Sequence, residues 1–238
     1  MRFVSDLPDP VDVPDLPIDQ LGLMMLGKFA EGGGWNSRNL MLELNEAGYR
    51  DEAGDAMAEA FAWLGNRGLV APDPRKNEWT AVTTTRLGQQ VLADGPAVLH
   101  ATERLQEGLH PLIEAKARRQ FLMGEYEQAV FVSMKAVEVR VRSLGGFGDD
   151  VYGVDLMNKA FNREAGKLAD QTVERGEREA MRSFFAGAYG VLRNPAGHRE
   201  IDYDDPIEAA EAVQTASLLM RLLDKIERRI TPPRVLGT

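Results

Sequence analysis

The sequence predicts a mainly α-helical protein, with a small winged-helix-like domain followed by a helical bundle. Three observations predict this. Apolar residues recur at helical spacing through most of the 238 residues. Two short β-type segments, near residues 69–72 and 79–82, flank a turn that contains Asp73, Pro74 and Asn77. From residue 99 onward only helical patterns occur, and the short segments between them suit a bundle.

The first part divides into an arm, residues 1–16, and a domain, residues 17–98. Asp and Pro alternate in the arm, which we expect to be extended. The domain should contain three helices, a β-hairpin and a further helix, the order of a winged helix. Ser37 is expected to cap the second helix, and Trp35 and Trp79 should lie in the core.

The charge of this part disfavours DNA as its partner. Residues 1–98 hold 8 Lys+Arg and 15 Asp+Glu, a balance of −7 within the total of −9. The third helix, through which winged helices often bind DNA, carries Asp55 and Glu59 and no basic residue before Arg67, although Arg75 lies in the wing. Because nucleic acids bind clustered positive charge, we interpret the domain as a protein-contact module.

Composition also bounds the chemistry. The chain has no cysteine, which excludes disulfides and cysteine-based sites, and its three histidines are dispersed, which disfavours a metal site. We therefore assign no metal and no cofactor. No apolar run reaches the roughly 18 residues of a membrane helix, and the N-terminus has no apolar signal core. These features predict a cytoplasmic protein without a membrane partner.

The second domain, residues 99–238, should be a bundle of four or five helices. Pro111 should begin one of them, preceded by His110 as a cap or loop residue. Asp205 and Pro206 have the types expected at the N-cap and first position of the last helix. The helical patterns are found in residues 111–122, 125–144, 155–161, 176–192 and 205–230.

The stretch RNPAGHRE, residues 193–200, is the candidate functional site. Asn194 and Pro195 are good residues for the cap and first position of a new helix, whose positive end would favour an anion. Arg193 and Arg199 can hold a phosphate, and the imidazole of His198 can move a proton near neutral pH. These groups suffice to cut RNA without a metal. Spacing alone favours a structural role instead: a cap, an ion pair of Arg193 and a packed histidine.

The RNPAGHRE stretch together with the two segments that precede it favours the functional interpretation. The segments DLMNKAF and FFAGAYGVL, followed by RNPAGHR, resemble the HEPN superfamily and, within it, the Ymh-type branch, over residues from about 110 to 229. Arg193, Asn194 and His198 occupy the places of that superfamily's Arg, polar residue and His. The resemblance implies a helical-bundle homodimer and a metal-independent endoribonuclease, leaving a 2′,3′-cyclic phosphate. It also implies a toxin or an effector of defence against phage.

Two further residues are candidates for support of this site. Lys135 and Glu138 lie three positions apart on one helix and either point into the cleft and orient His198 or form an exposed pair. Two alternatives to the nuclease stay open. One is a non-catalytic regulator that uses the bundle to dimerise, and the other is a scaffold subunit of a defence complex that contacts a partner protein through the N-terminal domain.

Overall fold

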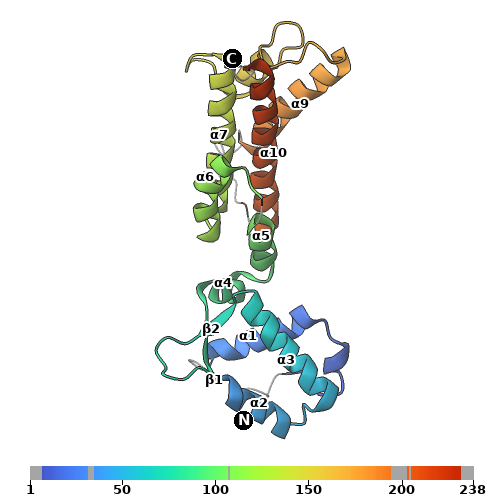
Figure 1. Cartoon of the computed structure of the whole chain (residues 1–238), viewed down its shortest axis with the longest axis vertical. Coiled ribbons are helices and arrows are strands. Elements are labelled where there is room, and N and C mark those ends of the chain that lie inside the picture. The colour runs from blue at the N-terminus through green and yellow to red at the C-terminus, as the bar shows by residue number, and fades with distance from the viewer. Residues whose placement is uncertain (1–6, 32–34, 107, 194–202, 204, 232–238) are drawn as a thin grey trace, which may run out of the picture. The chain divides into compact units, whose positions relative to one another are not determined.

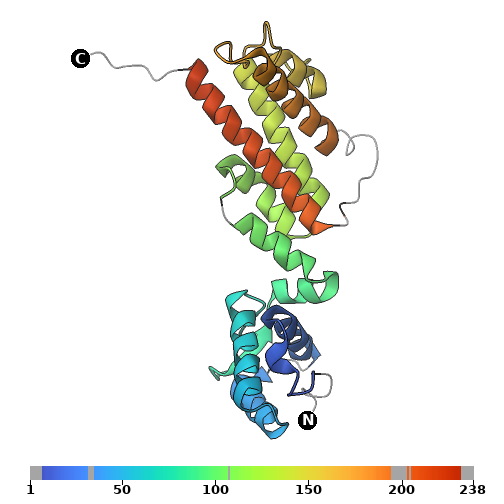
Figure 2. The ribbon, with the colours of Figure 1, turned by 90° about the vertical axis from the view of Figure 1, so that its right-hand side faces the viewer.

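A computed structural model describes residues 7–31, 35–106, 108–193, 203 and 205–231. These residues are mainly helical, as predicted. The chain forms two compact units that meet in sequence between Leu99 and His100. Figures 1 and 2 show their elements. Within the described part of the chain, no helix is long and apolar enough to cross a membrane.

The first unit contains the predicted helices and hairpin, together with two short elements that the sequence did not predict. Its elements are η2 (Val13–Asp15), α1 (Ile18–Glu31), β1 (Trp35–Asn36), α2 (Ser37–Glu46), α3 (Asp51–Asn66), β2 (Val70–Pro72), β3 (Ala81–Thr84) and α4 (Arg86–Asp94). The strands form an antiparallel sheet in the order β1-β3-β2. A buried core joins α1 and α3 to the sheet, with Met25, Met57 and Leu64 among its fully buried residues.

Three predictions for this unit are wrong. Residues 13–15 are not extended, because the apolar Val13 is buried in the core and forms part of a 3-10 helix. Trp79 is 96% exposed, since it lies in the turn before β3 rather than in the strand. Asn36, and not Ser37, caps α2: its side chain accepts hydrogen bonds from the Arg38 N–H (3.0 Å) and the Asn39 N–H (3.2 Å). The side chain of Trp35 lies outside the described residues.

The second unit is built from helices. They are α6 (Pro111–Leu122), α7 (Tyr126–Gly145), α8 (Gly153–Ala160), α9 (Arg175–Leu192) and α10 (Pro206–Ile230). A further helix, α5 (Ala97–Gln106), spans the division between the two units and was not predicted as a separate element. In Figure 1, α6, α7 and α10 lie side by side, and α9 contacts α7, α8 and α10.

Local signals in the sequence set the ends of these helices. His110 caps α6, because its Nδ1 accepts the Leu112 N–H (3.2 Å) ahead of Pro111. The Asp205 carboxylate caps α10 by accepting the Ile207 N–H (2.8 Å). Gly146, in the left-handed conformation with φ 70°, ends α7. The predicted caps at His110 and Asp205 are therefore confirmed.

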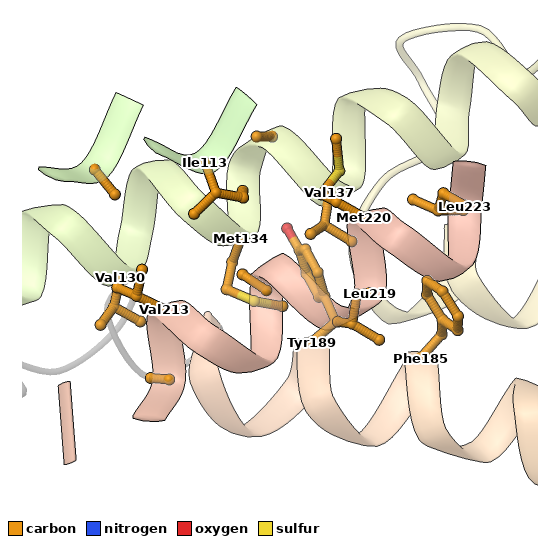
Figure 3. Close-up of a cluster of buried hydrophobic side chains, with 14 of the residues drawn as sticks. Ile113, Val130, Met134, Val137, Phe185, Tyr189, Val213, Leu219, Met220 and Leu223 are labelled. Carbon is orange, nitrogen blue, oxygen red and sulfur yellow. The ribbon is translucent and has the colours of Figure 1, made fainter. Parts of the chain in front are cut away.

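The core of the second unit is built by α6, α7, α8, α9 and α10, and Figure 3 shows part of it. Met134 and Val137 of α7 lie in this core with Met220 and Leu223 of α10. On α9 the inward residues are Phe185 and Tyr189, whereas their neighbour Phe184 is 40% exposed. The ring of Phe185 stacks on that of Phe161 with centroids 4.2 Å apart, which rotates its neighbour Phe184 outward.

Candidate active site

The described part of the RNPAGHRE stretch is Arg193, which caps the C-terminus of α9. Its N–H donates to the Tyr189 carbonyl (3.0 Å). Its guanidinium lies over two aromatic rings, 5.1 Å from the centroid of Phe131 and 6.0 Å from that of Tyr189. Such stacking fixes the direction of an arginine without using its N–H groups. The buried Nε has no hydrogen-bond partner among the described residues.

Arg193 lies at the wall of a cleft of about 410 Å³. Residues from α7, from the loop after it, from the start of α8 and from the end of α9 line this cleft: Glu138, Arg142, Asp149, Tyr152, Gly153, Val154, Tyr189 and Arg193. The cleft is large enough for a small ligand or one unit of a polymer. Its described charged groups are two guanidiniums and two carboxylates, so charge is concentrated here although it nearly cancels.

Glu138 organises this cleft from its floor. The carboxylate is buried and its Oε1 accepts the N–H of Gly153 (2.9 Å) and Nη2 of Arg142 (3.2 Å). It also forms a side-chain hydrogen bond with Tyr189. Burial, followed by this bond to Glu138, raises the pKa of the Tyr189 phenol well above its ordinary value, so the phenol stays protonated and remains a donor. Glu138 therefore ties α7 to α8 and α9 at the base of the cleft.

The two arginines of the cleft are not equivalent. Arg142 is already held, because its Nε donates to the Val151 carbonyl (3.1 Å) and its Nη2 to Glu138. Arg193 makes no ion pair with a residue that the structure describes and keeps its Nε unused. A free, oriented guanidinium beside a neutralised one suits the binding of a single anionic group such as a phosphate.

The other predicted site residues divide into three groups. Glu138 lies in the same cleft as Arg193, as expected for a supporting residue. Lys135 does not: it is exposed and lines a different groove, between α6 and α7, although three positions separate it from Glu138 on the same helix. Asn194, His198 and Arg199 lie outside the described residues. Glu138 is buried and bonded to Arg142 and Gly153, so it does not form the exposed pair with Lys135 that was one of the two alternatives.

Sequence reasoning missed three residues of this cleft. Arg142 follows Glu138 by four positions, a spacing that places an acid and a base on one helix face. Tyr189 precedes Arg193 by four positions and is fully buried, so its signal is that of a core residue. Tyr152 is 68% exposed in the loop before α8, and nothing in its local sequence relates it to Arg193.

A second group of polar residues, at the start of α6, resembles a catalytic triad but is structural. His110 Nε2 lies 3.0 Å from Asp224 Oδ2, and Ser217 is nearby. Both ring nitrogens of His110 form hydrogen bonds within the protein: Nδ1 accepts the Leu112 N–H, and Nε2 donates to Asp224. The Ser217 hydroxyl accepts the His110 backbone N–H (2.8 Å) and does not meet the ring. Neither nitrogen is left to act on a substrate. Within the described residues no cluster of metal-ligating side chains occurs.

Comparison with known proteins gives one match. No curated protein and no solved structure matches the chain. A family model described as "Protein of unknown function (Hypoth_ymh)" matches residues 107–223. This range begins just before α6 and ends inside α10, so it contains the cleft and the RNPAGHRE stretch. It agrees with the Ymh-type resemblance of the sequence. Residues 107–223 of the chain are therefore similar to the Hypoth_ymh family.

Proposed function

We propose that the C-terminal unit is a metal-independent endoribonuclease, with a role as a toxin or as an effector of defence against phage. The observation that carries this proposal is the guanidinium of Arg193 in the wall of the cleft, which stacks on Phe131 and Tyr189 and forms no ion pair with a described residue. His198 follows it by five residues in the sequence. A fixed cation and a group that titrates near neutral pH are the two components that this reaction requires.

The proposed reaction is an internal transesterification. His198 removes the proton of a ribose 2′-OH, and the 2′-oxygen attacks the adjacent phosphorus. Arg193 binds the non-bridging phosphate oxygens and stabilises the charge that grows on them. The bond from phosphorus to the 5′-oxygen breaks, and a proton returns to that oxygen. The products are a 2′,3′-cyclic phosphate and a 5′-OH, with no metal and no water consumed.

The remaining residues of the site have supporting roles in this proposal. Asn194 orients the phosphate or the imidazole, and Arg199 adds a second cation. Glu138 acts at a distance from the substrate, by holding Arg142 and the Tyr189 hydroxyl that form the walls of the cleft. Lys135 has no part in this proposal, because it lines the groove between α6 and α7 and not the cleft.

A second copy of the chain would bring two such sites together. The outer face of α9 supports this, because Phe184 (40% exposed) and Val191 (70% exposed) lie on it, three and four positions from Gly187. A Cβ at Gly187 would meet no described atom within 4 Å, which leaves room for another helix to approach. The small residues of α7, such as Ala129 and Ser133, are buried inside the unit itself and are therefore not exposed to a second copy.

We expect the protein to be a homodimer through the outer face of α9. Light scattering at micromolar concentration should give about twice the 26.3 kDa chain mass. Phe184→Asp should shift the mass toward that of the monomer, because it buries a charge in the interface. Leu122→Asp, at an equally exposed apolar residue on α6, is the control and should leave the mass unchanged. A monomer for the unmodified protein contradicts the prediction.

Incubation of the pure protein with total RNA, with and without EDTA, tests the proposed activity. Sequencing of the cut ends should show 2′,3′-cyclic phosphate and 5′-OH termini at the same sites in both conditions. Cleavage that EDTA removes, or 5′-phosphate ends, would overturn the mechanism. Absence of cleavage together with specific binding of duplex DNA would favour the non-catalytic regulator instead.

A further inference from the structure

A second hollow of the C-terminal unit lies on the face of α7 that does not enter the core. It is a groove of about 470 Å³ between α6 and α7. Leu112 and Lys116 line it from α6, and Val132, Lys135, Ala136, Val139, Arg140 and Ser143 line it from α7. Of the proposed active site, the residues that the structure describes, Arg193 and Glu138, are not among them. The groove and the cleft at Arg193 thus share no described lining residue.

The floor of this groove is apolar and partly exposed. Leu112 is 46% exposed and Val139 is 50% exposed, whereas Val132 is half-buried and Ala136 is buried. Along α7 the residues Val132, Ala136, Val139 and Ser143 follow one another by four, three and four positions, which places them on one face over about 16 Å of helix. Such a stripe of three turns has the length and spacing of a helix-binding groove.

The rim of this groove is positively charged. Lys116 and Lys135 are both exposed, and neither makes an ion pair with a residue that the structure describes. Arg140, the third cation, is neutralised by Glu227 and by Asp224 (3.8 Å). No carboxylate lines the groove among the described residues. Two free cations thus flank an apolar floor, in a chain whose net charge is −9.

We propose that the α6/α7 groove binds an amphipathic, acidic helix of a partner protein. The partner's apolar residues, at i, i+4, i+7 and i+11 spacing, would cover Val132, Ala136 and Val139. The small side chains of Ala136 and Ser143 let its backbone approach. Acidic residues at the edges of its apolar face would pair with Lys116 and Lys135, which fixes orientation and speeds association. A second copy that docks through the same groove does not fit, because its own lysines would face these two.

A designed peptide tests this proposal with the full-length protein. The probe is a fluorescent 16-residue helix with Leu at four positions of i, i+4, i+7 and i+11 spacing, and Glu on both sides of this stripe. We expect saturable binding by fluorescence anisotropy that weakens as salt rises. The same peptide with Lys in place of Glu should bind at least about tenfold more weakly.

Variants then locate the site. Val139→Asp should abolish binding of the Glu peptide, and Lys116→Glu/Lys135→Glu should weaken it about tenfold or more. The double variant should gain affinity for the Lys peptide, a reversal that general unfolding cannot produce. Arg119→Glu, at an exposed residue of α6 that does not line the groove, is the matched control and should bind normally.

Four results would overturn the proposal. They are equal affinity for the Glu and Lys peptides, normal binding by the double variant, displacement of the peptide by single-stranded RNA, and conversion of a dimer to a monomer by Val139→Asp. The last two would assign the groove to nucleic acid or to a second copy. All four are independent of RNA cleavage, which uses the cleft at Arg193.

Discussion

His198→Ala is expected to abolish RNA cleavage while leaving the thermal unfolding of the protein nearly unchanged. Loss of a general acid or base costs a factor of about 10²–10⁴ in rate. The proposal assigns the imidazole to proton transfer and not to packing, so its removal should cost little stability. Cleavage rate and thermal melting are measured on the same sample. A variant that melts earlier and keeps its activity per folded molecule would show that His198 is structural.

Arg193 variants test the other half of the same site. Arg193→Ala should lose cleavage to a similar extent, because it removes the cation that binds the phosphate. It should also cost some stability, about 0.5–1 kcal/mol, because the guanidinium stacks on Phe131 and Tyr189. Arg193→Lys should recover activity only in part, since lysine lacks the planar fork.

A control for these variants lies on the same helix. Arg175 is the first residue of α9, at the opposite end from Arg193, and its side chain is 63% exposed. Arg175→Ala should cleave RNA at the normal rate. If it lost as much activity as Arg193→Ala, general positive charge would explain the effect, and the specific role of Arg193 would be wrong.

The second large effect is expected on stability. Glu138→Ala should lower the free energy of unfolding of the C-terminal unit by about 3 kcal/mol or more, because it leaves Arg142 and the Tyr189 hydroxyl without their buried partner. Glu138→Gln should cost less, since the amide oxygen still accepts the Gly153 N–H. Urea unfolding followed by circular dichroism measures both variants.

Asp155→Ala is the matched control for Glu138. Asp155 also pairs with a base four positions along its helix, Lys159, but its side chain is 64% exposed. Exposed pairs of this kind contribute only about 0.3–0.5 kcal/mol. Glu138→Ala and Asp155→Ala should therefore differ by several-fold in their effect. Equal effects would show that the buried network of Glu138 does not hold α7, α8 and α9 together.

Most helices of this protein could be predicted from the sequence, because the information that defines them is local. The stripes of α7 and α10 follow the 3.6-residue period, and both face the core. His110 and Asp205 are cap residues by side-chain chemistry, and both caps form. The RNPAGHRE stretch and its neighbouring segments likewise identified the family, since a motif is read along the chain.

Only the tertiary structure decided which faces meet. The sequence placed Lys135 beside Glu138, but the packing of α8 and α9 against α7 buries Glu138 with Arg142 and Tyr189 and leaves Lys135 on the groove with α6. Trp79 and Val13 also show that the sequence alone does not decide which apolar side chains are buried. Trp79 was expected in the core and is exposed, whereas Val13 was expected in an extended arm and is buried. Periodicity fixes the faces of a helix relative to one another, whereas the partner of each face depends on contacts between residues distant in the sequence.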